Sequence, residues 1–404
     1  MGEQMSSAVV QFKPKSQEPQ EPGAQSFWGS FSLKSQLRTF TMVFALVAIW
    51  GIFAWHTEGA FLQPRNISNL LIQMSVTGIL SVGMVLVIVT RQIDLSVGSV
   101  VCFLGALMAV LNTNHGWNPL SAFAMTAAVG IAVGLFQGYL HAYQRIPAFI
   151  VTLGSMMAFR GAAMWILGGS TVPLQESWLL GVGTSYVSPR IGWIITIVAV
   201  VITMTKAIQE FRAAKKYGVM ASSPIGLLAK TIAICGLMIG FMTVLASYEG
   251  IPVPVLLMLG LMLVGHFLAT QSAWGRHVYA IGGNPDAAFL SGINTKFSVL
   301  LVFGLMGILT TVAGLVATAR VGSASPDAGQ LLELDAIASC VIGGTSLMGG
   351  KGFIPGAILG ALVMESLNNG MSMANMEPFW QYIVKGLVLV SAVWVDMLSQ
   401  DKTR

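Results

Sequence analysis

LSVGSVVCFLGALMAVLNTNHGWNPLSAFAMTAAVGIAVGLFQGYLHAYQ, residues 95–144, contains no aspartate, glutamate, lysine or arginine. Because a helix needs about 20 mainly apolar residues to cross a bilayer, this stretch is long enough for two membrane spans. The turn between them is expected at residues 112–119. Further uncharged runs occur at residues 40–55, 66–90, 231–248, 250–275 and 297–319. The sequence therefore predicts an all-α, polytopic membrane protein.

The composition supports the same class. Only 9% of the 404 residues are charged and 55% are hydrophobic, whereas a soluble domain typically has about 25% charged residues. We expect about 10–12 membrane segments, including Gly-rich broken helices. One such break follows an apolar piece at residues 336–347, which is too short to cross unaided. A weak similarity between residues 85–100 and 338–353 favours two related halves.

The distribution of basic residues predicts the orientation. They gather in the N-terminal tail, in a loop at residues 206–216 and around residues 276–296, and the positive-inside tendency places all three in the cytoplasm. The C-terminus lies outside if residues 336–347 only dip into the membrane, and inside if they cross with the help of neighbouring structure. The expected domains are a polar, disordered cytoplasmic tail (1–37), a single transmembrane domain (38–398) and a short tail (399–404).

A short helix with both ends marked is predicted between two spans. Asn284 can cap its first free amides, and Pro285 suits the first helical position. Gly292 supplies the left-handed residue that ends it. About two turns do not persist alone in water, so this helix must dock on something, and Phe289 and Leu290 are its apolar contacts. We therefore expect a partner outside the bilayer to bind it.

Three charged residues lie within the expected spans, namely Arg160, Glu365 and Lys385. A charge at mid-membrane costs about 3 kcal/mol on insertion scales, so each needs a reason. They either border a polar route or form ion pairs and carbonyl contacts that fix the helices. The second interpretation is favoured, with Arg160 and Glu365 as the expected pair.

Amide, hydroxyl and indole groups in and near the spans suit a neutral solute rich in hydroxyls, because amides donate and accept hydrogen bonds and indoles stack on sugar faces. Hydrogen bonds between helices explain any single one of these residues equally well. The Gly-rich break should also lie near the route, because irregular backbone at membrane depth is tolerated only inside protein or beside a wet cavity. The candidate route residues are Asn368, Asn369, Trp380, Gln381, Gln73, Thr77, Gly343 and Gly344.

No catalytic or metal-binding set is apparent. The nearest approach to a phosphate-binding loop, residues 345–352, has Thr345 and Gly352 where glycine and serine or threonine are required. The cysteines and histidines show no ligand spacing, and no basic stripe suggests nucleic acid. Coupling to an ion gradient would need several facing carboxylates, and Glu365 is nearly the only one within a span. Energy is therefore expected to come from a partner protein.

Three motifs carry a resemblance to a known family. Residues 93–99 (IDLSVGS), 279–293 (YAIGGNPDAAFLSGI) and 334–347 (LDAIASCVIGGTSL) resemble the membrane permeases of bacterial ABC importers for pentoses and hexoses. The match extends from about residue 38 to residue 397. An additional hairpin at residues 191–246 and the segment WQYIVKG at 380–386 resemble the xylose type more than the shorter ribose type.

The resemblance implies a subunit of the bacterial inner membrane with a cytoplasmic N-terminus. It implies ATP-driven import of a monosaccharide, xylose or another pentose, from periplasm to cytoplasm by alternating access. The expected partners are an ATP-binding subunit that carries ATP and magnesium, a periplasmic sugar-binding protein, a second permease copy as homodimer and the lipid bilayer. The alternative is an ion-coupled secondary sugar transporter acting alone; an intramembrane enzyme is a third class. The short helix then becomes the coupling helix, with residues Asn284, Pro285, Asp286, Ala287, Ala288, Phe289, Leu290, Ser291, Gly292 and Ile293.

Overall fold

The computed structural model describes residues 33–175, 177–217 and 224–401, and these form helices joined by four two-residue strands. The long helices are α1 (Leu33–His56), α2 (Pro64–Val89), α3 (Val97–Ala109), α4 (Pro119–Ala142), α5 (Ala148–Leu167), α7 (Pro189–Tyr217), α8 (Pro224–Ala246), α9 (Val253–Gln271), α12 (Thr295–Val321), α14 (Ile354–Met373) and α15 (Pro378–Asp401). The shorter helices are η1 (Ala60–Leu62), the π-helical η2 (Val110–Asn114), α6 (Trp178–Thr184), α10 (Ala273–Gly283), α11 (Pro285–Leu290) and α13 (Leu332–Ile342).

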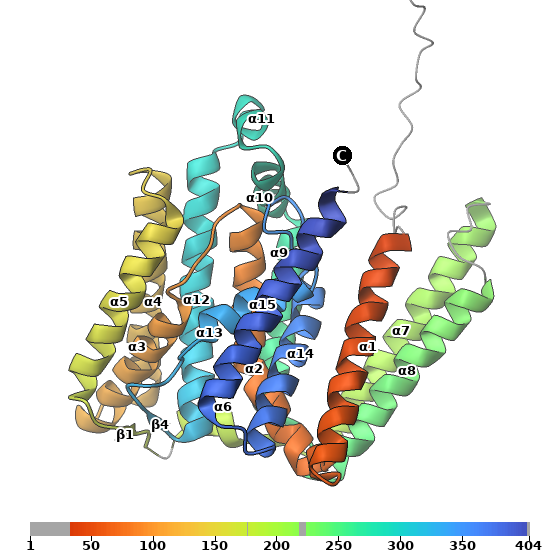
Figure 1. Cartoon of the computed structure of the whole chain (residues 1–404), viewed down its shortest axis with the longest axis horizontal. Coiled ribbons are helices and arrows are strands. Elements are labelled where there is room, and N and C mark those ends of the chain that lie inside the picture. Colours follow the sequence, from red (N-terminus) through yellow and green to blue (C-terminus); the bar gives the residue numbers. More distant parts are fainter. Residues whose placement is uncertain (1–32, 176, 218–223, 402–404) are drawn as a thin grey trace, which may run out of the picture.

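Eight helices in the described part of the chain are long and apolar enough to span a membrane: α2, α3 with η2, α4, α5, α7, α8, α9 and α12. Helices α1, α14 and α15 stand beside them in Figure 1. The prediction of an all-α, polytopic membrane protein is therefore confirmed. Large apolar side chains are exposed along the outer helices, among them Trp165, Ile194 and Leu237, which suits contact with lipid chains.

The centre of the bundle is built on α2 and α12. The apolar window of α2 is 94% buried and that of α12 is 72% buried, whereas those of α7 and α8 are only 11% and 6% buried. The α7–α8 hairpin accordingly lies at the periphery of the bundle, at the right edge of Figure 1 beyond α1. Since a lipid-facing helix has little protein around it, the two central helices are the ones that position the interior residues.

Close approach of α4 to α12 uses the glycines that the sequence spaces four apart. A side chain added at Gly130 would meet Thr311, one at Gly134 would meet the carbonyl of Phe303, and one at Gly138 would crowd Leu300. Glycines at four-residue spacing lie on one helix face and allow such close approach. Gly236 and Gly240 on α8 have the same spacing, but no atom lies within 4 Å of a Cβ added at either of them.

Substituting Gly134 with leucine should force α4 and α12 apart, because backbone atoms of Phe303 and Gly307 occupy the space. We expect the free energy of unfolding to fall by about 1–3 kcal/mol or more. The midpoint of thermal unfolding in detergent would report it. Gly240→Leu on α8 is the matched control, since open space surrounds that position. Equal midpoints for both variants would contradict the packing described here.

Two helices begin inside the bundle rather than at its ends. Residues 92–96 have no regular secondary structure and lead into the bundle before α3, and residues 326–331 form turns before α13 (Figure 1). The two entry segments touch, because Gly98 packs on the Gly329 backbone and on Glu333. The predicted broken helices are therefore present. Their irregular segments precede α3 and α13.

The short strands and α6 lie at the opposite end from α11 in Figure 1. At that end β1 (Val172–Pro173) pairs with β4 (Ser323–Ala324), and β2 (Tyr186–Val187) pairs with β3 (Ile251–Pro252). Helix α12 runs into β4, whereas α14 starts near α10, where the Tyr279 hydroxyl donates to the carbonyl of Gly352 at 2.8 Å. The segment containing α13 thus crosses the bundle. Of the two alternatives, crossing is the one observed, and α15 ends on the α11 side.

Several boundaries differ from the sequence-based expectation. Residues 206–216 are the end of α7 and not a loop, and the expected external loop at 168–189 contains β1, α6 and β2. Residues 33–37 already belong to α1, and 399–401 still belong to α15. Helix α10 was not anticipated, because it is only 11 residues long and follows α9 after a single residue, Ser272. The rest of the N-terminal tail, Glu176 and residues 402–404 lie outside the described residues.

Candidate functional site

Helix α11 has the ends that the sequence predicts. The Asn284 side chain accepts a hydrogen bond from the Ala287 amide at 3.0 Å, and Pro285 occupies the first turn. Gly292 has φ +82°, the left-handed conformation that glycine adopts without steric cost. The helix extends beyond the rest of the bundle at one end (Figure 1). The capped helix is therefore confirmed, and it leads directly to α12, whose own N-cap is Asn294.

The outer surface of α11 is apolar. Phe289 is 68% exposed and Leu290 is 85% exposed, while Ala288 is buried against the protein. Two adjacent large apolar side chains in water on so short a helix are costly to leave uncovered, since burying each contributes about 1.5–3 kcal/mol. This pair is the candidate docking surface of the molecule, and we call it the α11 apolar tip.

Inside the bundle, five polar side chains join four helices. The Thr77 hydroxyl of α2 donates to Glu365 of α14 at 2.5 Å, and the Asn368 amide contacts Glu365 at 3.3 Å. The same Asn368 amide donates to Asp335 of α13 at 3.2 Å, and Lys385 of α15 pairs with Asp335 at 3.0 Å. We call Thr77, Asp335, Glu365, Asn368 and Lys385 the four-helix polar network.

The four-helix polar network is largely dry, with Thr77 0%, Asp335 3% and Glu365 6% exposed. One carboxylate oxygen of Asp335 and the amide oxygen of Asn368 are buried without a hydrogen-bond partner in the described structure. An unpaired buried acceptor is expensive. Both oxygens can therefore accept hydrogen bonds from a group that the isolated chain does not supply.

The structure brings together only part of the predicted route. Asn369 accepts a hydrogen bond from Asn66 of α2 at 2.9 Å, next to the network, and Gln73 lies half-buried four residues before Thr77. Gln381 donates to the carbonyl of Met376 at 2.9 Å at the start of α15, and Trp380 is 50% exposed there. Gly343 and Gly344 lie at the other end of α13, where Gly343 packs against the backbone of Gly356.

The expected pair of Arg160 with Glu365 is wrong. Arg160 donates to the carbonyls of Pro326 at 3.0 Å and Ala328 at 2.7 Å, in the irregular segment that precedes α13. The intramembrane ion pair instead joins Lys385 to Asp335. A buried ammonium requires an acid partner, but the sequence offers both Asp335 and Glu365, and only the packing of the helices brings Asp335 to Lys385.

A second polar cluster lies where α3 begins. Asp94 is buried and accepts from the Ser96 amide at 2.8 Å and hydroxyl at 2.6 Å, and Gln137 of α4 donates to the same hydroxyl at 2.9 Å. Thr152 of α5 donates to the carbonyl of Ile93 at 3.2 Å. These contacts satisfy polar groups of the extended segment inside the bundle, as irregular backbone at such depth requires.

Comparison with known proteins assigns the chain to a class. Residues 66–393 match the family model described as "Branched-chain amino acid transport system / permease component". The xylose transport system permease protein of Escherichia coli K12 is 43% identical over 93% of this chain and 96% of its own length. Its counterpart in Haemophilus influenzae is 42% identical over 92% of this chain and 100% of its own length. The ribose import permease protein of E. coli K12 is 35% identical over 84% and 88%, respectively. No solved structure matches the chain.

Proposed function

The chain belongs to this permease family, as a non-catalytic membrane subunit of the bacterial ABC sugar importers, and we propose that it carries xylose or another pentose from the periplasm to the cytoplasm. Family membership implies an ATPase subunit, which carries the nucleotide, and a sugar-binding protein. The observation that carries the proposal is the identity of 43% along nearly the whole chain. The α11 apolar tip also supports the proposal, because its exposed apolar side chains can be buried against a partner protein.

For the coupling step, we propose that residues Asn284 to Ile293 dock in the ATPase subunit and that its closure on ATP and magnesium moves them as a lever. The capping of α11 and the exposure of Phe289 and Leu290 support this role. The α11 side of the bundle is then cytoplasmic. Basic residues on that side, Arg276 and Lys296, agree with the positive-inside tendency, and the start of α1 lies there too. The N-terminus is accordingly proposed to be cytoplasmic.

Two copies of the chain are proposed to form the transport unit in the inner membrane, with two α11 helices and two ATPase subunits. ATP-driven alternating access needs a seam or cavity that opens to each side in turn. The four-helix polar network is the proposed solute contact, because the unpartnered oxygens of Asp335 and Asn368 can accept hydrogen bonds from sugar hydroxyls. Asn369, Gln73, Trp380 and Gln381 would extend the route towards the periplasm, and Gly343 and Gly344 towards the cytoplasm.

Reconstitution tests the proposed function. Proteoliposomes containing the permease and its ATPase subunit, with the binding protein added outside and ATP inside, should accumulate radiolabelled xylose. We expect uptake to require ATP and to be unaffected when proton and sodium gradients are collapsed. A vesicle with the same complex and a non-hydrolysable ATP analogue is the control. Uptake by the permease alone, driven by an ion gradient, would contradict the proposal and support the secondary-transporter alternative.

A further inference from the structure

Three segments that are distant in the sequence meet at the α11 end of the bundle. They are the end of α2 with Val89 and Arg91, the end of α10 with Gly282 and Gly283, and the loop between α13 and α14 with Gly349 and Gly350. We call this contact the three-way junction. A side chain added at Gly282 would meet the Val89 carbonyl, and one at Gly349 would meet Arg91. Backbones therefore touch directly there, and no other residue type fits without displacement.

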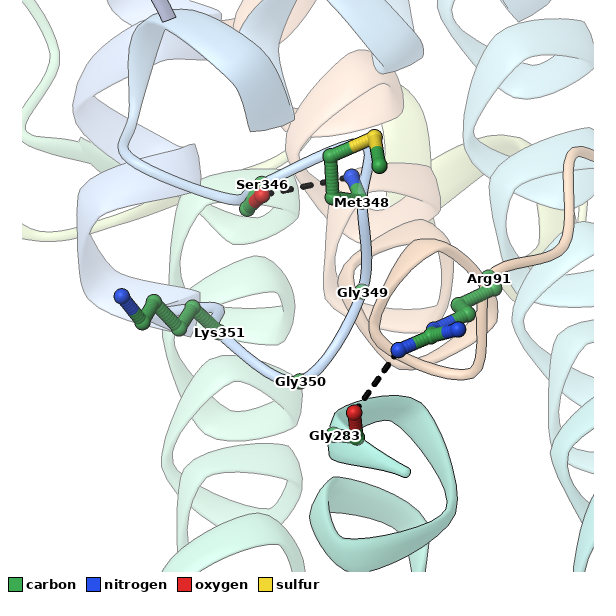
Figure 2. A pocket seen from close by; sticks show the side chains of 7 residues that line it. All are labelled: Arg91, Gly283, Ser346, Met348, Gly349, Gly350 and Lys351. Carbon is green, nitrogen blue, oxygen red and sulfur yellow. Dashed lines mark hydrogen bonds between the residues drawn. The ribbon is translucent and has the colours of Figure 1, made fainter. Parts of the chain in front are cut away.

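Hydrogen bonds fasten the three-way junction. Arg91 donates through Nε to the Gly282 carbonyl at 2.7 Å and through an Nη atom to the Gly283 carbonyl at 2.7 Å. Figure 2 shows the Arg91 side chain reaching across to Gly283. Both residues line a cavity of ≈ 320 Å³. The Gly350 amide donates to the Val89 carbonyl at 2.9 Å. A planar guanidinium fork on the last carbonyls of a helix is both geometrically and electrostatically favoured.

Each segment of the three-way junction leads directly into another helix of the bundle. Gly283 is followed by Asn284, the cap of α11, so α10 and α11 share a single linking residue. Arg91 has φ +65° and turns the chain into the extended segment before α3. Gly349 and Gly350 belong to the loop that follows α13. The junction thus connects the docking helix to both helices that start inside the bundle.

We propose that Arg91 is a positioning residue that transmits displacement of α11 to the segment before α3 and to the loop after α13. The proposal rests on the proposed docking role of α11. The fork spans two carbonyls of α10, so a shift of α10 pulls on the Arg91 backbone and on the chain that leads to Asp94. The Gly350–Val89 bond and the Tyr279–Gly352 bond carry the same shift to the loop after α13. Proteins transmit motion through such chains of rigid contacts.

Arg91→Ala in the complete complex tests the proposal. The readout is sugar imported per ATP hydrolysed in proteoliposomes, together with retention of the ATPase subunit on an affinity-tagged permease. We expect retention of the ATPase subunit to equal that of the unmodified complex and sugar per ATP to fall about tenfold, because two charge-assisted hydrogen bonds are lost. Arg91→Lys should restore only part of the ratio of sugar to ATP. It keeps the positive charge, but one ammonium cannot bond two carbonyls as the planar guanidinium does.

Arg276→Ala is the matched control, because Arg276 also lies on α10 but donates within its own neighbourhood, to the carbonyl of Gln271 at 3.3 Å. Its ratio should be unchanged. An unchanged ratio for Arg91→Ala, or loss of the ATPase subunit from that variant, overturns the proposal while leaving the proposed function intact. Absence of ATP-dependent uptake in the unmodified complex would instead refute the proposed function. If Arg91→Ala fails to fold, Arg91→Lys decides instead. A ratio of sugar to ATP below that of the unmodified complex supports the proposal, and an equal ratio overturns it.

Discussion

Replacing both Phe289 and Leu290 with aspartate is expected to release the ATPase subunit while the permease still inserts and folds. The two side chains are 68% and 85% exposed in the isolated chain, so their removal costs the permease itself little. In the proposed complex they are buried, and losing two such apolar contacts weakens association by about 3–6 kcal/mol, or at least about 100-fold. Desolvating two carboxylates at the same place adds to that loss.

The measurement is co-purification of the ATPase subunit with tagged permease, alongside thermal unfolding of the permease in detergent. Lys215→Asp on α7 changes the net charge by the same two units at an exposed position away from α11, and it should leave association intact. If the double aspartate variant keeps its ATPase subunit and transports sugar, α11 is not the docking element. Loss of folding in that variant would likewise contradict the exposure described here.

Features set by local physics could be predicted from the sequence. The membrane spans follow from uninterrupted apolar length, which the bilayer thickness fixes. The ends of α11 follow from Asn284, Pro285 and Gly292, each of which acts on backbone groups within four residues of itself. The spacing of Gly130, Gly134 and Gly138 puts small residues on one helix face, which is typical of close helix packing, but only the structure identifies α12 as the partner.

Features that depend on long-range contacts could not be predicted. Helix α13 packs against α2 and α14, and an 11-residue helix carries no sign of these neighbours in its own sequence. Arg91 follows the uncharged run at residues 66–90, but its partners Gly282 and Gly283 lie about two hundred residues away. The partner of Lys385 was missed for the same reason, since two carboxylates were available and only the packing of α13 selects Asp335.

Lys385→Met is expected to destabilise the bundle strongly. The Lys385 side chain is 16% exposed and that of Asp335 only 4% exposed, and the ion pair between them links α15 to α13. Removing one partner of a buried pair leaves an uncompensated charge, which costs about 3–5 kcal/mol. Asp335 would keep only its contact with the Asn368 amide, and its second oxygen already has no partner in the described structure. Thermal unfolding in detergent and yield from the membrane should both fall clearly.

The double variant Asp335→Asn with Lys385→Met separates the cost of a lone charge from the value of the pair. It removes both charges and keeps a polar group beside Asn368, so most of the lost stability should return. Lys206→Met on α7, where the lysine is exposed, is the matched control and should change little. Failure of the double variant to recover would mean that the ion pair itself holds α13. If stability recovers but xylose uptake is lost, Asp335 has a role in contacting the solute. If both recover, the ion pair serves only to hold α13 and α15 together.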